Sequence, residues 1–165
     1  MISQTESLDK IDIQILKALQ EDARVTTKEL AAKVNLSSTP VFERMKRLEK
    51  EGYIKKYVAV LDSEKLNHGF VVFCNVKLNQ VNHEIVENFT EKISQIPEVS
   101  ECYNISGRFD FLLKVYAPDM RHYQEFITNV LGHIASIGSI ESSFVAQEAK
   151  RDLAILRQAG KHPRA

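Results

Sequence analysis

Basic side chains gather in one stretch of the sequence, LSSTPVFERMKRLEKEGYI, which covers residues 36–54. Its four cations fall within seven residues and are Arg44, Lys46, Arg47 and Lys50. The whole chain has a formal net charge of zero, whereas residues 24–56 carry nine basic and four acidic side chains. Such a local cluster of cations can bind the phosphates of a nucleic acid, although the solvated face of an ordinary helix carries similar charges.

A second candidate site is the short segment SGRFD, residues 106–110. A glycine in a hairpin exposes backbone amides that can bind a carboxylate, and Asp110 could hold an ammonium group. Together these groups would suit a free amino acid. The alternative is an ordinary hairpin in which Gly107 supplies a positive φ and Asp110 bonds its own turn. Spacing alone favours this alternative.

The remaining reactive residue types show no spacing that indicates catalysis. Four of the histidines lie without an HxxxH or HExxH pattern, at His68, His83, His122 and His133. The sequence has no phosphate-binding glycine loop and no nucleophile elbow. Its two cysteines, Cys74 and Cys102, are not a CxxC pair, which favours buried reduced thiols. We therefore predict no catalytic residue, no metal and no cofactor.

Composition indicates a soluble globular protein of one ordinary domain or two small ones. The chain has 165 residues, of which 44% are hydrophobic and 27% charged. No apolar run approaches the roughly 20 residues that span a bilayer, and the first residues do not resemble a signal peptide. We expect no membrane association and a cytoplasmic location.

Three helices are predicted in the first third of the chain. Residues 8–20 have apolar side chains at helical spacing, with Asp9 available as the N-cap. Thr26 and Glu29 have the spacing of a capping box for a second helix that reaches about Val34. After a three-residue turn, Ser37 can cap a third helix through Lys50, which Gly52 stops. This order predicts a helix-turn-helix unit.

The third helix is amphipathic in a way that suits the major groove of DNA. Val41, Met45 and Leu48 share the side that faces the core, and the opposite side carries short polar groups followed by cations. We assign base contacts to Ser38, Thr39 and Glu43, and phosphate contacts to Lys46, Arg47 and Lys50. The complete set of candidate DNA contacts is Thr26, Thr27, Ser37, Ser38, Thr39, Phe42, Glu43, Lys46, Arg47, Lys50 and Lys55.

Two flanking features of this helix leave alternatives open. Phe42 either packs on the second helix or touches a thymine methyl group. Lys55 and Lys56, in the extended segment after Gly52, could meet flanking phosphates as a minimal wing. The N-terminal unit is therefore predicted to be winged-helix-like.

The rest of the chain alternates between strands and helices. The expected strands are residues 70–78, 99–105, 111–117 and 139–148, and the expected helices are residues 82–96 and 118–134. The order βαββαβ is that of a ferredoxin-like domain, with two helices on one face of an antiparallel sheet. Apolar residues remain on the other face, so we expect a second copy of the chain to cover it. The fold class is α+β.

The sequence resembles the Lrp/AsnC family of transcription regulators. The resemblance rests on LDKIDIQIL, ELAAKVNLSSTPVFERMKRLEKEGYIKKYVAVLD, VSECYNISGRFDFLLKV and SFVAQEAK, which occur in family order over about residues 8–150. It implies a DNA-binding domain at residues 1–54, a linker strand and hinge at 55–68, and a dimerisation and effector domain at 69–150. Residues 151–165 form a C-terminal extension, in which Leu153 and Leu156 are candidates for docking on a neighbour.

The resemblance also implies partners. Family members dimerise through the sheet domain and assemble further, often into octamers, and a free amino acid binds between dimers beside the hairpin. This favours ligand binding over an ordinary hairpin at residues 106–110. The implied effector residues are Tyr103, Asn104, Ser106, Gly107, Arg108, Phe109 and Asp110. Arg108 departs from the family pattern, and it either serves a ligand carboxylate or occupies the site itself.

We therefore predict a DNA-binding transcription regulator that is not an enzyme and whose assembly and DNA affinity respond to an amino acid. Two other functions remain as alternatives. Siroheme decarboxylases resemble the same architecture but need a basic, histidine-bearing cavity, whereas residues 57–165 are acidic on balance. An RNA-binding sheet is faintly suggested by RFDFLLKV, which lacks the glycine of the ribonucleoprotein signature.

Overall fold

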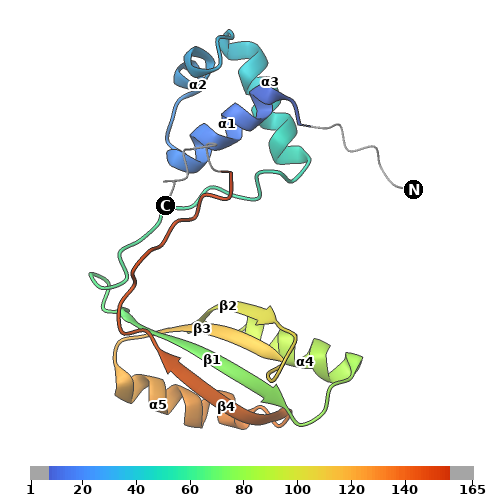
Figure 1. Cartoon of the computed structure of the whole chain (residues 1–165), viewed down its shortest axis with the longest axis vertical. Coiled ribbons are helices and arrows are strands. Elements are labelled where there is room, and N and C mark those ends of the chain that lie inside the picture. The colour runs from blue at the N-terminus through green and yellow to red at the C-terminus, as the bar shows by residue number, and fades with distance from the viewer. Residues whose placement is uncertain (1–7, 157–165) are drawn as a thin grey trace, which may run out of the picture. The chain divides into compact units, whose positions relative to one another are not determined.

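A computed structural model describes residues 8–156, which divide into two compact units (Figure 1). The first unit contains the described residues up to Val60 together with those from Lys150 onward. The second unit is Leu61–Ala149. The chain therefore passes between the units twice, once after Val60 and once after Ala149.

Capping residues and turns define the three helices of the first unit. Helix α1 is Lys10–Glu21, α2 is Thr27–Lys33 and α3 is Ser38–Lys50. Two of the three predicted N-caps make the expected bond, because Asp9 accepts from the amide of Asp12 and Thr26 accepts from that of Glu29, whereas the Ser37 side chain makes none. Asn35 adopts φ 54° between α2 and α3, a conformation that asparagine tolerates better than most residues. Gly52 adopts φ 79° just after α3.

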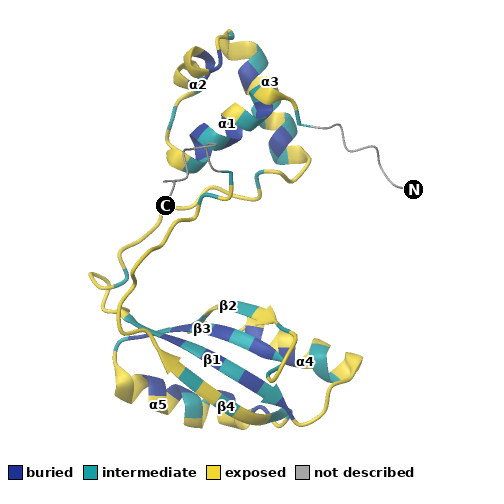
Figure 2. Cartoon of the chain, viewed as in Figure 1, coloured by how far each residue is buried: buried dark blue, intermediate teal, exposed yellow. Residues whose placement is uncertain are grey.

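A small apolar core joins these helices (Figure 2). Each helix contributes completely buried side chains, among them Ile15 from α1, Leu30 from α2, and Val41 and Leu48 from α3. Met45, predicted to share this core, packs against it and is partly buried. The core fixes which side of α3 faces inward and which faces solvent.

The second unit is a four-stranded antiparallel sheet with helices on one face. Its strands are β1 (Phe70–Leu78), β2 (Val99–Asn104), β3 (Phe111–Ala117) and β4 (Ile137–Phe144), in the spatial order β2-β3-β1-β4. Helices α4 (His83–Ser94) and α5 (Met120–Asn129), with the short 3₁₀ helix η1 (Leu131–His133), complete the predicted ferredoxin-like plan. The core lies between sheet and helices, where Phe89 of α4 stacks near Phe111 of β3.

The other face of the sheet carries side chains from alternate strand positions. Val72, Cys74 and Val76 of β1 are buried on the helix side, so Val71, Phe73 and Asn75 point to the opposite side. The same alternation on β3 places Leu112, Lys114 and Tyr116 there. Neither α4 nor α5 covers this face, as predicted.

The segment between the units differs from the prediction. Residues 55–68 were expected to include a strand, but the structure has none there, and residues 63–67 form a turn. A strand needs a neighbouring strand to pair with, and no such neighbour lies beside this segment in the described chain. The last strand also ends earlier than expected, at Phe144 rather than Glu148. Within residues 8–156, none of the helices has the length and apolar character needed to cross a bilayer.

Candidate nucleic-acid interface and ligand loop

Helix α3 presents a polar side to solvent. The exposed side chains along it are Ser38, Thr39, Phe42, Glu43, Lys46 and Lys50. Completely buried Val41 and Leu48 lie on the opposite side. The small hydroxyl side chains are near the start of the helix and the lysines near its end. This arrangement allows short side chains to approach base edges while the cations reach phosphates.

Lys46 and Phe42 are neighbours on this exposed side. The Lys46 Nζ atom lies 5.7 Å from the centroid of the Phe42 ring and donates a hydrogen bond of 3.0 Å to Glu49. Phe42 is 46% exposed, so much of its ring is accessible. The pair between Lys46 and Glu49 is at the surface, where such pairs contribute little to stability, and a phosphate can replace the glutamate.

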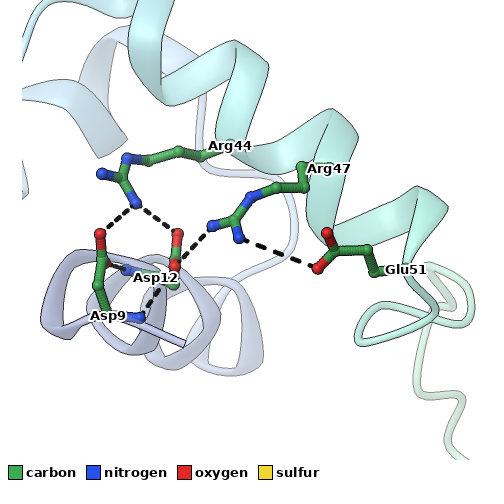
Figure 3. Close-up of polar contacts among 5 residues, drawn as sticks. All are labelled: Asp9, Asp12, Arg44, Arg47 and Glu51. Carbon is green, nitrogen blue, oxygen red and sulfur yellow. Dashed lines mark hydrogen bonds and ion pairs between the residues drawn. The ribbon is translucent and has the colours of Figure 1, made fainter. Parts of the chain in front are cut away.

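Behind the exposed side, α3 is fixed to α1 by a charged cluster that we call the Asp12 cluster (Figure 3). It consists of Asp9, Asp12, Arg44, Arg47 and Glu51. Asp12 is only 1% exposed, and its two carboxylate oxygens accept from Arg44 at 2.7 Å and from Arg47 at 2.6 Å. Arg44 also donates to Asp9 at 2.6 Å, and Arg47 lies 3.9 Å from Glu51.

The charge of Asp12 is stabilised by this arrangement. Burial alone would raise the pKa of Asp12, but the hydrogen bonds from Arg47 and Arg44 outweigh it and hold the pKa below its ordinary value. The hydrogen bonds that Arg44 donates to Asp12 and Asp9 raise the pKa of Arg44. A buried carboxylate with two arginine partners is compensated, and losing any partner would leave a buried charge.

The structure divides the predicted cations of α3 into two groups. Lys46 and Lys50 point to solvent, whereas the guanidinium group of Arg47 bonds to Asp12. Arg47 was predicted as a phosphate contact, and in this structure its bond to Asp12 holds α3 against α1. Arg44, which was not among the predicted DNA contacts, also bonds to Asp12 and holds α3 against α1.

The predicted polar contacts before α3 have different surroundings. The Thr26 hydroxyl is engaged in the α2 capping box, where it donates to Glu29 at 2.8 Å. Ser37 is the N-cap residue of α3, but its side chain makes no capping bond. Thr27 is partly buried, and Lys55 is exposed beyond the end of α3. Of these four residues, Ser37 and Lys55 therefore have the side chains that are more available for a contact with DNA.

The ligand loop, residues 106–110, joins β2 to β3. Gly107 adopts φ 134°, and a Cβ atom built there would meet nothing within 4 Å. The simple hairpin interpretation expected the Asp110 side chain to bond its own turn, but that side chain bonds to β1 instead. Its carboxylate accepts from Lys77 Nζ at 2.9 Å and from the Leu78 amide at 2.8 Å, both at the end of β1. The Lys77 hydrogen bond is the main reason that the pKa of Asp110 is lowered.

The other predicted effector residues surround this loop. Asn104 donates to the Asp110 carbonyl at 3.1 Å, which braces the hairpin. The Arg108 guanidinium lies 5.1 Å from the Phe109 ring centroid and 3.6 Å from Glu141 of β4. Tyr103 lies just before Asn104 on β2, is 51% exposed, and donates to Glu101. Ser106 and Gly107 are exposed at the tip.

The sequence analysis overlooked two important residues, Asp12 and Lys77, and only Asp12 had a detectable signal in the sequence. Asp12 occurs at helical spacing before Ile15 and Leu16, so it lies in the apolar stripe of α1, where an acid needs a buried partner. Lys77 is on the strand face opposite the core, and only the pairing of β1 with β3 brings it to Asp110. Within residues 8–156, no cluster of three or more histidine, cysteine or acidic side chains could hold a metal.

Comparisons with known proteins match both units. Residues 8–55 match the family model described as winged helix-turn-helix DNA-binding, and residues 71–155 match that of the Lrp/AsnC ligand binding domain. The Bkd operon transcriptional regulator of Pseudomonas aeruginosa is 41% identical over 137 residues, which are 83% of this chain and 90% of the relative. The leucine-responsive regulatory protein of Escherichia coli is 36% identical over 146 residues, 88% of this chain and 89% of the relative.

Solved structures also match along most of the chain. A transcriptional regulator from Neisseria meningitidis, solved as a complex with L-Met, has a TM-score of 0.85 and 35% sequence identity. The alignment covers 89% of this chain and 95% of that one. Because 89% of this chain is aligned, the likeness includes most of both units.

Proposed function

Because the chain belongs to the Lrp/AsnC family of transcription regulators, we propose that it binds double-stranded DNA through the exposed side of α3 and responds to a free amino acid at the ligand loop. The observation that carries the DNA assignment is the amphipathic placement of α3. Its inner side is fixed by the core and by the Asp12 cluster, and its outer side carries hydroxyl groups followed by lysines.

In this proposal different side chains of α3 contact the bases and the phosphates. Ser38, Thr39 and Glu43 contact base edges, with Glu43 suited to accept from a cytosine amino group. Lys46 and Lys50 contact phosphates, and Lys55 meets the flanking backbone. Thr26 and Thr27 at the start of α2, and Ser37 at the N-cap position of α3, contact phosphates. Arg47 can join them if it exchanges Asp12 for a phosphate.

The test of DNA recognition is selection of binding sites from random duplexes, followed by affinity measurements with single variants. Glu43→Gln is expected to lose discrimination at one base position while retaining affinity for non-specific DNA. Glu91→Gln, on the exposed side of α4, is the matched control and should leave both quantities unchanged. Equal discrimination in the Glu43 variant and the unaltered protein would remove Glu43 from base recognition.

An amino acid is the ligand class that best fits the loop. Backbone amides at the exposed glycine tip, together with Arg108, can receive a carboxylate, and Asp110 offers negative charge for an ammonium group. The relatives support this class, since one is named as leucine-responsive and another was solved with L-Met. Thermal-shift measurements against the twenty amino acids test it. We expect stabilisation by at least one amino acid and loss of that effect in Asp110→Asn.

Self-association is the third part of the proposal. The uncovered sheet face has Phe73, Leu112 and Tyr116 among its partly buried side chains, and a second copy of the chain can cover them. A dimer would present two α3 helices, so the preferred DNA sites should be quasi-palindromic. Further assembly, up to an octamer, would let an amino acid act by binding one assembly more tightly than another.

We also propose that this regulator is located in the cytoplasm, where its DNA is found.

The two alternative functions receive less support. The curated relatives reported above are named as regulators and not as enzymes, which argues against a siroheme decarboxylase. RNA binding by the sheet would compete with dimerisation for the same face. Competition between RNA and selected DNA for the protein separates this alternative from DNA binding.

A further inference from the structure

The C-terminal segment returns to the DNA-binding unit after leaving β4. Residues 150–156 group with the first unit and not with the sheet from which they emerge. Residues 155 and 156 contact Gln20, near the C-terminal end of α1. Residues 150–156, which we call the strap, are therefore the second connection between the sheet and the helical unit.

One side chain of α1 holds the backbone of the strap. The Gln20 side-chain oxygen accepts from the amide of Ile155 at 2.8 Å and from that of Leu156 at 3.2 Å. The Gln20 side-chain nitrogen donates to the Leu156 carbonyl at 3.3 Å. The carboxamide thus uses both its donor and its acceptor on adjacent peptide groups, as a neighbouring backbone would.

Two further features orient the strap. Leu156 packs against the apolar core of the helical unit, whereas its neighbour Ile155 is 89% exposed. The amide of Ala154 donates to the Asp152 side chain at 3.0 Å, which forms a turn just before the contact. Backbone bonds and a single apolar anchor therefore act at the same place.

We propose that residues 150–156 are a docked strap, held by Gln20 and Leu156, that ties the end of the effector sheet to helix α1. The docking surface is formed by the C-terminal end of α1, and its partner is this segment of the same chain. Because β4 leads into the strap and also carries Glu141, the residue that Arg108 approaches, a change at the ligand loop has a direct route to α1. This last role rests on the proposed function, whereas the docking itself does not.

Hydrogen exchange of the full chain, without DNA or amino acid, tests the docking. The amides of Ile155 and Leu156 are expected to exchange slowly, and Gln20→Ala should speed their exchange by about tenfold, the change that follows loss of one net hydrogen bond. Gln14→Ala is the matched control, since Gln14 is an exposed glutamine of the same helix. Fast exchange in the unaltered protein, or equal protection in the two variants, would overturn the proposal.

A second pair of variants tests Leu156 as the apolar anchor of the strap. Leu156→Ala should release the Ile155 amide, and Ile155→Ala should leave the Leu156 amide protected, because only Leu156 packs on the core. Equal effects of these two changes would also contradict the strap.

The coupling between the ligand loop and α1 is tested by comparing DNA affinity with and without the stabilising amino acid in Gln20→Ala. A retained amino-acid response with a released strap would reject the coupling alone and leave DNA recognition by α3 intact.

Discussion

At the residue scale, Lys46 is the side chain whose predicted role is most sharply defined by its position. It is exposed on α3, and its only described ionic partner is Glu49 on the same helix. Replacing that surface pair by a phosphate releases counterions from the DNA, which lowers affinity as salt rises. The role therefore has a measurable signature.

Lys46→Ala is expected to weaken binding to all DNA sequences by a similar factor and to reduce the slope of log affinity against log salt by about one. Fluorescence anisotropy across a series of salt concentrations measures the slope. Lys92→Ala, in α4 of the other unit, serves as the control. An unchanged slope in the Lys46 variant would show that this lysine does not contact a phosphate.

Asp12 has a structural role with a defined pH dependence. Its pKa is lower in the folded chain than the ordinary value of 3.8, so the stability it provides is complete above 3.8 and is lost as the pH falls through the folded-state pKa. Asp12→Asn should lower the free energy of unfolding by about 3 kcal/mol at neutral pH. The variant should also lose less stability than the unaltered protein when both are acidified.

Urea unfolding followed by circular dichroism at several pH values tests this prediction. Glu21→Gln, an exposed acid at the end of α1, is the control and should change little. If Asp12→Asn and the unaltered protein lost stability in parallel on acidification, the Asp12 cluster would not be the source of the pH dependence.

Single residues were also where the sequence was least informative. The outward side of α3 follows from helical periodicity, and the structure exposes the predicted side chains of this helix except Arg47. The partners of Arg47 and Asp110 could not be foreseen, because Asp12 and Lys77 lie more than thirty positions away in the chain. Periodicity specifies which way a side chain points on its own element, but not what it meets on another.

At the scale of elements, short-range patterns were sufficient wherever a local rule decides the structure. The capping boxes, the turn at Asn35 and the βαββαβ order all depend on residues close in sequence. The expected strand within residues 55–68 failed because strand formation depends on a partner and not only on a β-rich composition. The docking of the strap could likewise not be predicted from the sequence, because its anchor Gln20 is 136 residues from Leu156.

Helix α2 gives the element-scale prediction. Thr26→Ala removes the hydroxyl that caps α2, so the free energy of unfolding should fall by about 1 kcal/mol. Thr26→Ser keeps a hydroxyl and should recover most of the loss. Thermal unfolding compares the variants. If Thr26→Ser weakened stability as much as Thr26→Ala, the capping hydroxyl would not account for the effect.

At the scale of the whole molecule, the uncovered sheet face is the surface on which we propose that a second copy packs. Phe73→Lys places a charge at a partly buried position of β1 on that face, and we expect it to shift the protein toward monomer. Glu91→Lys introduces a lysine on the exposed side of α4 and should leave the assembly unchanged. Sedimentation velocity distinguishes these results. Identical assemblies for both variants would place the interface elsewhere.

The central claim is that the outer side of α3 is the surface that meets DNA. The most direct measurement is hydrogen exchange of the full chain with and without a selected DNA duplex, resolved along the sequence. We predict that added protection concentrates within Ser38–Lys50 and the residues just before it. Protection confined to the sheet unit, with α3 exchanging as it does in the free protein, would contradict the account.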